Sequence, residues 1–137
     1  MRISLSMLFG AAIVAGLAAP TAAFADGDAA RGAKVFKKCA ACHTATEEKN
    51  KVGPHLVDII DRPMASVEGY KYSKAMVAHA DEVPTWTVEA LDAYLRDPRG
   101  VVKGTKMVFP GLKKPEDVAN VIAYLATFDE NGATAGN

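Results

Sequence analysis

The sequence predicts a small all-α domain of about four to five short helices joined by long loops. Apolar residues recur at helical spacing in several separate stretches, capping residues precede those stretches, and no stretch shows the alternation of a half-buried strand. The chain has 137 residues, 50% of them hydrophobic, which suits one domain. Its 16 basic and 16 acidic side chains balance. This balance argues against a nucleic-acid binder, because such proteins carry a basic excess.

Residues 1–25 are predicted to be a cleaved secretory signal peptide that lies outside the fold. Arg2 precedes the uncharged run of residues 5–19, and the small-x-small triplet of residues 23–25 follows it. An uncleaved membrane anchor is the alternative, but the densest apolar part, residues 7–19, is short for a span of about 20 residues. We therefore expect a soluble, periplasmic chain that begins at Asp26, with no stable membrane insertion after processing.

Two helices are predicted in the N-terminal half of the mature chain. Asp28 can cap the first, which runs to about Lys38, and Ser73 can cap the second, which runs through Ala80. Between them, the stretch TATEEKNKV is polar, and the Gly53–Pro54 pair after it is a turn signal. We therefore expect a long loop between these two helices.

Two more helices are predicted in the C-terminal half. Thr85 or Thr87 can cap the first of them. Asp97–Pro98 ends it, because a residue before proline is biased away from helical dihedrals. Residues 100–111 are predicted to be a loop. Pro115 suits the first position of the last helix, whose apolar residues recur at helical spacing: Val118, Val121, Ile122 and Leu125.

Both cysteines stand in one motif, Cys39–Ala40–Ala41–Cys42–His43. Two thiols at this spacing can form thioethers to the two vinyl groups of one haem, and the adjacent imidazole is a ligand that haem iron accepts. A redox dithiol and half a zinc site are the alternatives. The first expects a βαβ pattern, which is absent, and the second lacks its other pair of ligands. The motif therefore predicts one covalently attached haem c, held by Cys39 and Cys42, with His43 as an iron ligand.

A large porphyrin would also explain how short helices and long loops form a core. Helices of this number and length bury little apolar surface by themselves, whereas the same helices wrapped around a haem enclose an apolar centre. We expect the haem domain to span residues 26–128. Residues 129–137 are polar and contain glycine, and we expect them to form a disordered tail.

The chain resembles the class I cytochrome c family, in its bacterial cytochrome c2 and mitochondrial-type branch, over residues 27–127. A haem motif near the mature N-terminus and a methionine 64 positions after His43 are typical of this branch. A four-helix cytochrome c′ would instead carry the motif near its C-terminus. The resemblance rests on these pieces: FKKCAACH, GPHL, Trp86, Tyr94–Leu95, KGTKMVF and IAYL.

The resemblance implies the small class I cytochrome c fold, wrapped around one haem. It also implies that the first and last helices cross at Gly32, Phe36 and Tyr124. The function that it implies is electron transfer by a soluble carrier that is not an enzyme.

Met107 is the second iron ligand that the resemblance implies. It lies in the non-helical stretch GTKM, where its side chain is free to approach the iron. Met76 sits in a helical pattern, where core packing is the default role of methionine, and Met64 follows Pro63 in a loop. Ligation by a histidine and a methionine raises the reduction potential of a haem and closes both axial positions. The remaining chemistry is outer-sphere transfer of one electron.

Two histidines compete with Met107 for the second axial position. In this family the carbonyl of the residue at Pro54 accepts the Nδ1–H of the iron-binding histidine, which orients that ring and makes it a better donor. His55 follows Pro54 and therefore belongs to the His43 side of the haem. His79 is expected to be a surface residue of a helix.

Five further site residues are implied by the same resemblance. Trp86, Arg62 and Tyr72 resemble the donors to the haem propionates, whose burial would be costly without hydrogen bonds. Tyr94 resembles the tyrosine that bonds near the methionine sulfur, and Thr105 resembles the hydroxyl of the same pocket. Ordinary aromatic packing is the alternative for Trp86 and Tyr94, and a solvated loop charge is the alternative for Arg62.

Lysines near the haem motif and the methionine loop predict a basic docking face for an acidic redox partner. By resemblance, the donor is of the bc1 type, the acceptor is an oxidase, a reaction centre or a reductase, and the carrier is a monomer of a respiratory or photosynthetic chain. A haem peroxidase or a ligand sensor with a displaceable Met107 is the alternative function, and a permanent subunit of a larger enzyme is another. The lysines are Lys37, Lys38, Lys103, Lys106, Lys113 and Lys114.

Overall fold

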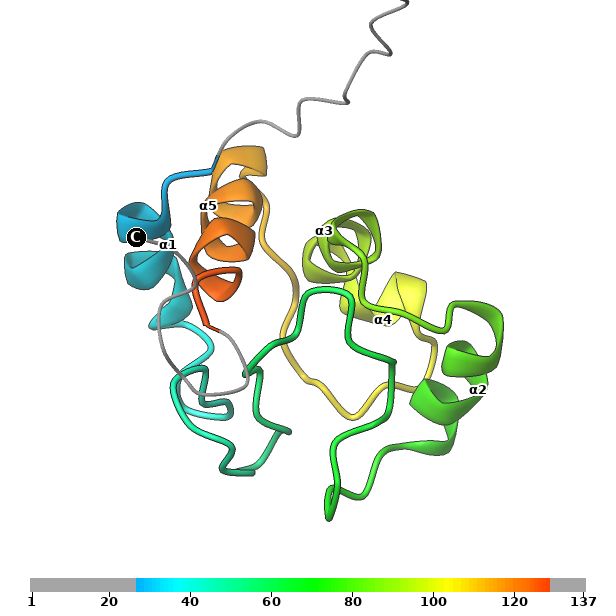
Figure 1. The fold of residues 1–137 in the computed structure, drawn as a ribbon. Coiled ribbons are helices and arrows are strands. Elements are labelled where there is room, and N and C mark those ends of the chain that lie inside the picture. The colour runs from blue at the N-terminus through cyan, green and yellow to red at the C-terminus, as the bar shows by residue number, and fades with distance from the viewer. Residues whose placement is uncertain (1–26, 129–137) are drawn as a thin grey trace, which may run out of the picture.

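The computed structural model describes residues 27–128, which form five helices and long loops (Figure 1). The only β-pairing in this part of the chain is an isolated bridge between Pro63 and Thr85. The all-α prediction is therefore confirmed. The predicted signal segment and tail lie outside the described residues. The helices are α1 (Ala29–Phe36), α2 (Lys74–Glu82), α3 (Val88–Arg96), α4 (Pro98–Val101) and α5 (Pro115–Leu125).

The predicted caps begin three of these helices. The Asp28 side chain accepts from the Arg31 N–H at 2.9 Å, and Ser73 Oγ accepts from the Met76 N–H at 3.0 Å. Of the two candidate threonines, Thr87 is the cap of α3. Each side-chain oxygen satisfies one of the N–H groups that the first turn of a helix leaves without a partner. The last helix, α5, begins at Pro115, as predicted.

Three predicted boundaries are wrong. Helix α1 ends at Phe36, because the next residues already form the turns that carry the cysteine motif, and α2 continues past Ala80 to Glu82. The predicted loop of residues 100–111 begins too early, since α4 extends to Val101. Asp97–Pro98 does end α3, but Asp97 then caps α4 through the Gly100 N–H and Pro98 takes its first position.

Helices α1 and α5 lie side by side at one end of the molecule and cross closely (Figure 1). A Cβ atom on Gly32 would lie 2.6 Å from Tyr124 Cβ and closer still to the Asn120 carbonyl, so only glycine allows this approach. Phe36 packs on Tyr124 with ring centroids 5.3 Å apart. The crossing predicted at these residues is confirmed, and it brings the start of the cysteine motif against the last helix.

Helices α2, α3 and α4 lie at the other end, and loops join the two ends (Figure 1). One loop pairs with the segment before α3, since the Met64 N–H donates to the Pro84 carbonyl at 2.8 Å and the Trp86 N–H donates to the Arg62 carbonyl at 2.9 Å. This pairing buries Met64 and holds Arg62 beside Trp86. None of the five helices is long and apolar enough to cross a membrane.

Candidate haem site

The cysteine motif lies in the turns that continue from α1. The Cys39 N–H donates to the Phe36 carbonyl at 2.7 Å, and the His43 N–H donates to the Cys39 carbonyl at 2.9 Å. These bonds wind Cys39, Cys42 and His43 into successive turns, so the two thiols and the imidazole are held on one short piece of backbone. Both thiols are free and half-buried. Burial raises the pKa of the Cys39 thiol, and the positive charge of Lys38 partly offsets this effect.

The His43 ring is fixed by a hydrogen bond to a loop. Its Nδ1 lies 2.6 Å from the Pro54 carbonyl oxygen, the contact that the family resemblance implies. Because a carbonyl only accepts, Nδ1 carries the proton and Nε2 keeps its lone pair. Burial lowers the pKa of His43, and the bond to Pro54 only partly opposes this. A neutral imidazole with a free Nε2 lone pair is the form that binds a metal.

Met107 follows a hydroxyl that anchors its backbone. Its N–H donates to Thr105 Oγ1 at 3.3 Å, and Thr105 Oγ1 lies 3.0 Å from the Tyr94 hydroxyl. Tyr94 is buried, with its ring centroid 5.2 Å from that of Trp86. Burial raises the pKa of the Tyr94 phenol, which therefore stays protonated at neutral pH. The structure thus brings Trp86, Tyr94, Thr105 and Met107 into one connected group.

We expect Thr105→Val to loosen the Met107 loop. The substitution keeps the shape of the side chain but removes the oxygen that Tyr94 and the Met107 N–H share, which costs about 1–3 kcal/mol of folding free energy. Chemical denaturation measures this loss. Thr105→Ser, which keeps the hydroxyl, is the matched control and should recover most of it. Equal stability of the valine variant and the native protein would contradict this role.

The three residues expected to serve the haem propionates lie together. The backbone pairing holds Arg62 beside Trp86. Burial lowers the pKa of the Arg62 guanidinium, and the nearby Tyr72 hydroxyl partly opposes this. The Tyr72 hydroxyl accepts from the Val67 N–H at 3.2 Å, and burial raises the pKa of this phenol. Their proximity could not be predicted from spacing along the chain, because the pairing between two loops creates it.

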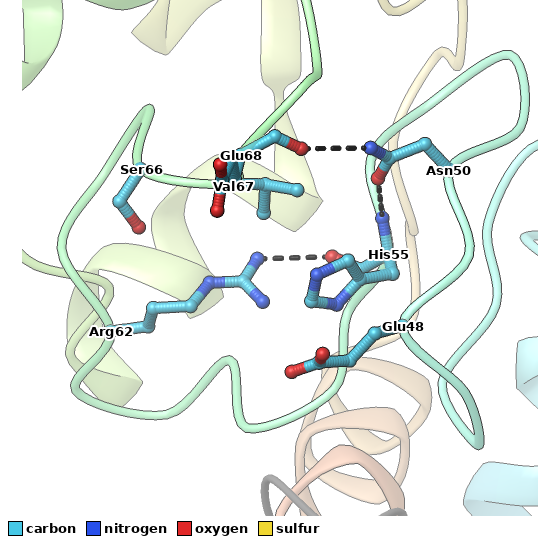
Figure 2. Close-up of a pocket in the computed structure, with 7 residues that line it drawn as sticks. All are labelled: Glu48, Asn50, His55, Arg62, Ser66, Val67 and Glu68. Atoms are coloured by element: carbon cyan, nitrogen blue, oxygen red, sulfur yellow. Dashed lines mark hydrogen bonds between the residues drawn. The ribbon is translucent and has the colours of Figure 1, made fainter.

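The Arg62 guanidinium is held in place by main-chain carbonyls. Its Nη1 donates to the Val57 carbonyl at 2.7 Å and its Nη2 to the His55 carbonyl at 3.0 Å, the second of these bonds being drawn in Figure 2. The third guanidinium nitrogen, Nε, is buried and has no partner among the described residues. A buried N–H of a charged group without an acceptor is costly. A haem carboxylate would satisfy it, so this residue fits the predicted group, and Arg62 is not a solvated loop charge.

A hollow of about 310 Å³ opens beside Arg62 (Figure 2). His55 lines this hollow, and its main-chain N–H donates to Asn50 Oδ1 at 3.1 Å. Asn50 Nδ2 in turn donates to the Glu68 carbonyl at 3.2 Å. Asn50 thereby ties the loop before Gly53 to the loop before α2. The His55 Nδ1 atom is buried and has no partner among the described residues. This cluster could not be predicted from the sequence, because no local motif joins its members.

His55 should make the protein less stable below neutral pH. Burial and the positive charge of Arg62 lower the pKa of His55 below its ordinary value of 6.5, and the carboxylate of Glu48 opposes them; Glu68 also lines the hollow. The unfolded chain then binds a proton at higher pH than the folded chain. Stability from His55 is complete above 6.5 and is lost as the pH falls through the folded pKa.

Denaturation curves between pH 7 and pH 5 measure this effect. His55→Asn should flatten the loss of stability across that range. A slope unchanged by His55→Asn would contradict the assignment.

Comparisons with known proteins identify the family of this chain. The family model described as cytochrome c matches residues 29–129. Cytochrome c2 of Afifella marina is 46% identical over 104 residues, which cover 75% of this chain and 84% of that protein. Cytochrome c-550 of Ancylobacter novellus is 48% identical, over 75% of this chain and 97% of that protein. The solved structure of cytochrome cH from Methylobacterium extorquens is 43% identical, with a TM-score of 0.68, over 74% of this chain and 99% of that one.

The matched region contains the fold, the cysteine motif and the residues grouped around it. Two free thiols beside an oriented imidazole fit the covalent attachment of a haem. The chain belongs to the cytochrome c family, has the class I cytochrome c fold, and is an electron carrier with one covalently bound haem c, not an enzyme.

Proposed function

We propose that His43 and Met107 are the two axial ligands of the haem iron. The observation that carries this proposal is that both residues are anchored by hydrogen bonds. The Pro54 carbonyl orients the His43 ring through Nδ1, and Thr105 Oγ1 anchors the Met107 N–H in a loop outside the helices. When bound, the haem supplies an iron that gains and loses one electron. His43 donates through Nε2, and Met107 donates through its thioether sulfur.

Closure of both axial positions would decide what the site can do. A thioether ligand favours ferrous over ferric iron and raises the reduction potential. With both His43 and Met107 as ligands, the iron would have no open coordination position for water or peroxide. This arrangement supports electron transfer in preference to peroxidase or sensor chemistry.

Arg62, Trp86 and Tyr72 would neutralise and orient the haem propionates. Each Nη atom of Arg62 donates to one carbonyl, and the Nε–H, which has no partner among the described residues, is available to a carboxylate. A charged donor to a buried carboxylate contributes about 1.5–3 kcal/mol. Tyr94 and Thr105 would serve the other side of the iron, since their hydroxyls meet beside the backbone of Met107.

The carrier is proposed to work in the periplasm. Its support is the predicted signal segment of residues 1–25, which would leave a haem domain of residues 26–128 and the tail 129–137. Cell fractionation and the intact mass of the purified protein test this. The mass should equal that of a chain beginning at Asp26 with one haem. A chain that keeps residues 1–25 and stays with the membrane fraction would contradict it.

Exposed lysines and an exposed apolar residue support a docking face near Met107. Val108, the next residue, is 79% exposed, and Lys103 and Lys106 on the same loop are exposed. Lys38 contributes less than expected, because it pairs with Asp117 at 3.8 Å. We expect this face to meet acidic surfaces of a bc1-type donor and of an oxidase, reaction-centre or reductase acceptor, with the carrier itself a monomer. Charges placed around an apolar centre favour fast, short-lived complexes.

The rate of electron transfer to such an acceptor should fall as salt is added. Between low salt and about 0.2 M, we expect a roughly tenfold decrease in the second-order rate constant, because steering by charges is screened. Lys103→Glu with Lys106→Glu should give most of this decrease at low salt, and Lys34→Glu on α1 is the control. A rate constant that is independent of salt would contradict the docking face.

A further inference from the structure

Gly53 lies between the cysteine motif and the Pro54 carbonyl, and its backbone is bonded on both sides. Its N–H donates to the Cys42 carbonyl at 2.8 Å, and its carbonyl accepts from the Lys51 N–H at 2.9 Å. The residue is buried. These bonds fix the Gly53 backbone relative to the same short segment that carries His43.

The Gly53 backbone also lies directly against the His43 ring. A Cβ atom built on Gly53 would lie 2.7 Å from Nδ1 and 2.8 Å from Nε2 of His43, and nearer still to Cε1. Real Cβ contacts are essentially never this short. These three distances place the Cβ over the face of the imidazole, above Cε1, so this face rests on the glycine and any other residue would displace the ring.

The contact supplies a restraint that the hydrogen bond to Pro54 lacks. A bond from Nδ1 to the Pro54 carbonyl at 2.6 Å fixes one direction of the ring but permits rotation about the line that joins the two atoms. The Gly53 backbone blocks that rotation on one side. We propose that Gly53 is a positioning residue that sets the plane of the His43 imidazole. This inference rests on the proposed assignment of His43 as an iron ligand.

The plane of an axial imidazole has an electronic consequence. The π orbital of the ring is perpendicular to that plane and overlaps with iron d orbitals of matching direction. Turning the ring changes which d orbital holds the unpaired electron of low-spin ferric iron. The distribution of spin over the porphyrin edge changes with it, and this edge is the part through which an electron passes to a partner. Residues around a metal ligand tune the metal in this way.

The ¹H NMR spectrum of the ferric holoprotein measures the plane, because the shifts of the four haem methyl groups depend on it. In Gly53→Ala we expect the chemical shifts of the four methyl groups to change relative to one another. The weak far-red absorption band, which arises from sulfur-to-iron charge transfer in a methionine-ligated ferric haem, should be retained. Gly69→Ala is the control, since a Cβ there meets no atom within 4 Å, although its φ of +71° adds strain. A methyl pattern in Gly53→Ala that matches the native protein would overturn the proposal.

A measurement on the native protein keeps the proposal testable if Gly53→Ala yields no holoprotein. In the diamagnetic ferrous form, the Gly53 Hα protons should show a strong nuclear Overhauser effect to the Hε1 proton of the His43 ring and a large ring-current shift. Absence of this effect would overturn the inference. The result is independent of Met107: a missing far-red band would remove the proposed methionine ligand, whereas the contact between Gly53 and His43 would still be measurable.

Discussion

Replacement of both cysteines by alanine should yield a colourless chain that has lost more than half of its helical far-ultraviolet signal. None of the five helices exceeds the 11 residues of α5, and isolated helices shorter than about 12–15 residues are marginal in water. Among the described helices, α2 packs against no other, since the helix contacts are those of α5 with α1 and α3, and of α3 with α4. Helix α2 reaches the core through Met76, and we expect the haem to complete the core around it.

Circular dichroism and pigment retention after acid extraction measure the outcome. The single variant Cys39→Ala keeps the possibility of one thioether through Cys42 and is the matched control. It should remain coloured and largely helical. A double variant with the helical content of the native holoprotein would show that the short helices and their loops form a core without a haem.

Met107→Ala should lower the reduction potential and open the iron to added ligands. Loss of the thioether removes a ligand that favours ferrous iron, and axial ligands set haem potentials over a range of about 0.8 V. We expect a decrease that is a substantial part of this range. Carbon monoxide, which should not bind the native ferrous protein readily, should bind the variant. Potentiometric titration and ferrous absorption spectra measure the two effects.

Met76→Ala is the matched control for this prediction. Met76 is buried, with 8% of its surface exposed, and belongs to the apolar core on α2. Its truncation should cost about 2–5 kcal/mol of folding free energy while the ligand band stays unchanged. If Met76→Ala abolished the band and Met107→Ala preserved it, the second ligand would be Met76 and the Met107 assignment would be wrong.

The sequence predicts the helices of this protein well because their start signals are local. Asp28, Ser73 and Thr87 each lie directly before the helix that they cap, so a few neighbouring residues determine the structure. Helix α4 was not predicted, because Asp97–Pro98 both ends α3 and begins α4. From the sequence alone, the residues that end one helix do not show that they also begin another.

In the candidate site, too, local features can be predicted from the sequence and long-range contacts cannot. The cysteine motif is visible in five consecutive residues, because the chemistry of attachment fixes its spacing. The hydrogen bonds from Arg62 to main-chain carbonyls and the contact between Gly53 and His43 cannot be predicted from the sequence. Each depends on how the loops fold back on the chain. In the sequence Gly53–Pro54 indicates only a turn, and the approach of its backbone to an imidazole requires the folded chain.

Optical spectra of the purified protein, oxidised and then reduced, test most directly whether the iron is closed by His43 and Met107. The ferric spectrum should contain the weak far-red band of sulfur-to-iron charge transfer, and the ferrous spectrum should stay unchanged under carbon monoxide. A pigmented protein without that band, whose ferrous form binds carbon monoxide at neutral pH, would have an open iron and would contradict the account.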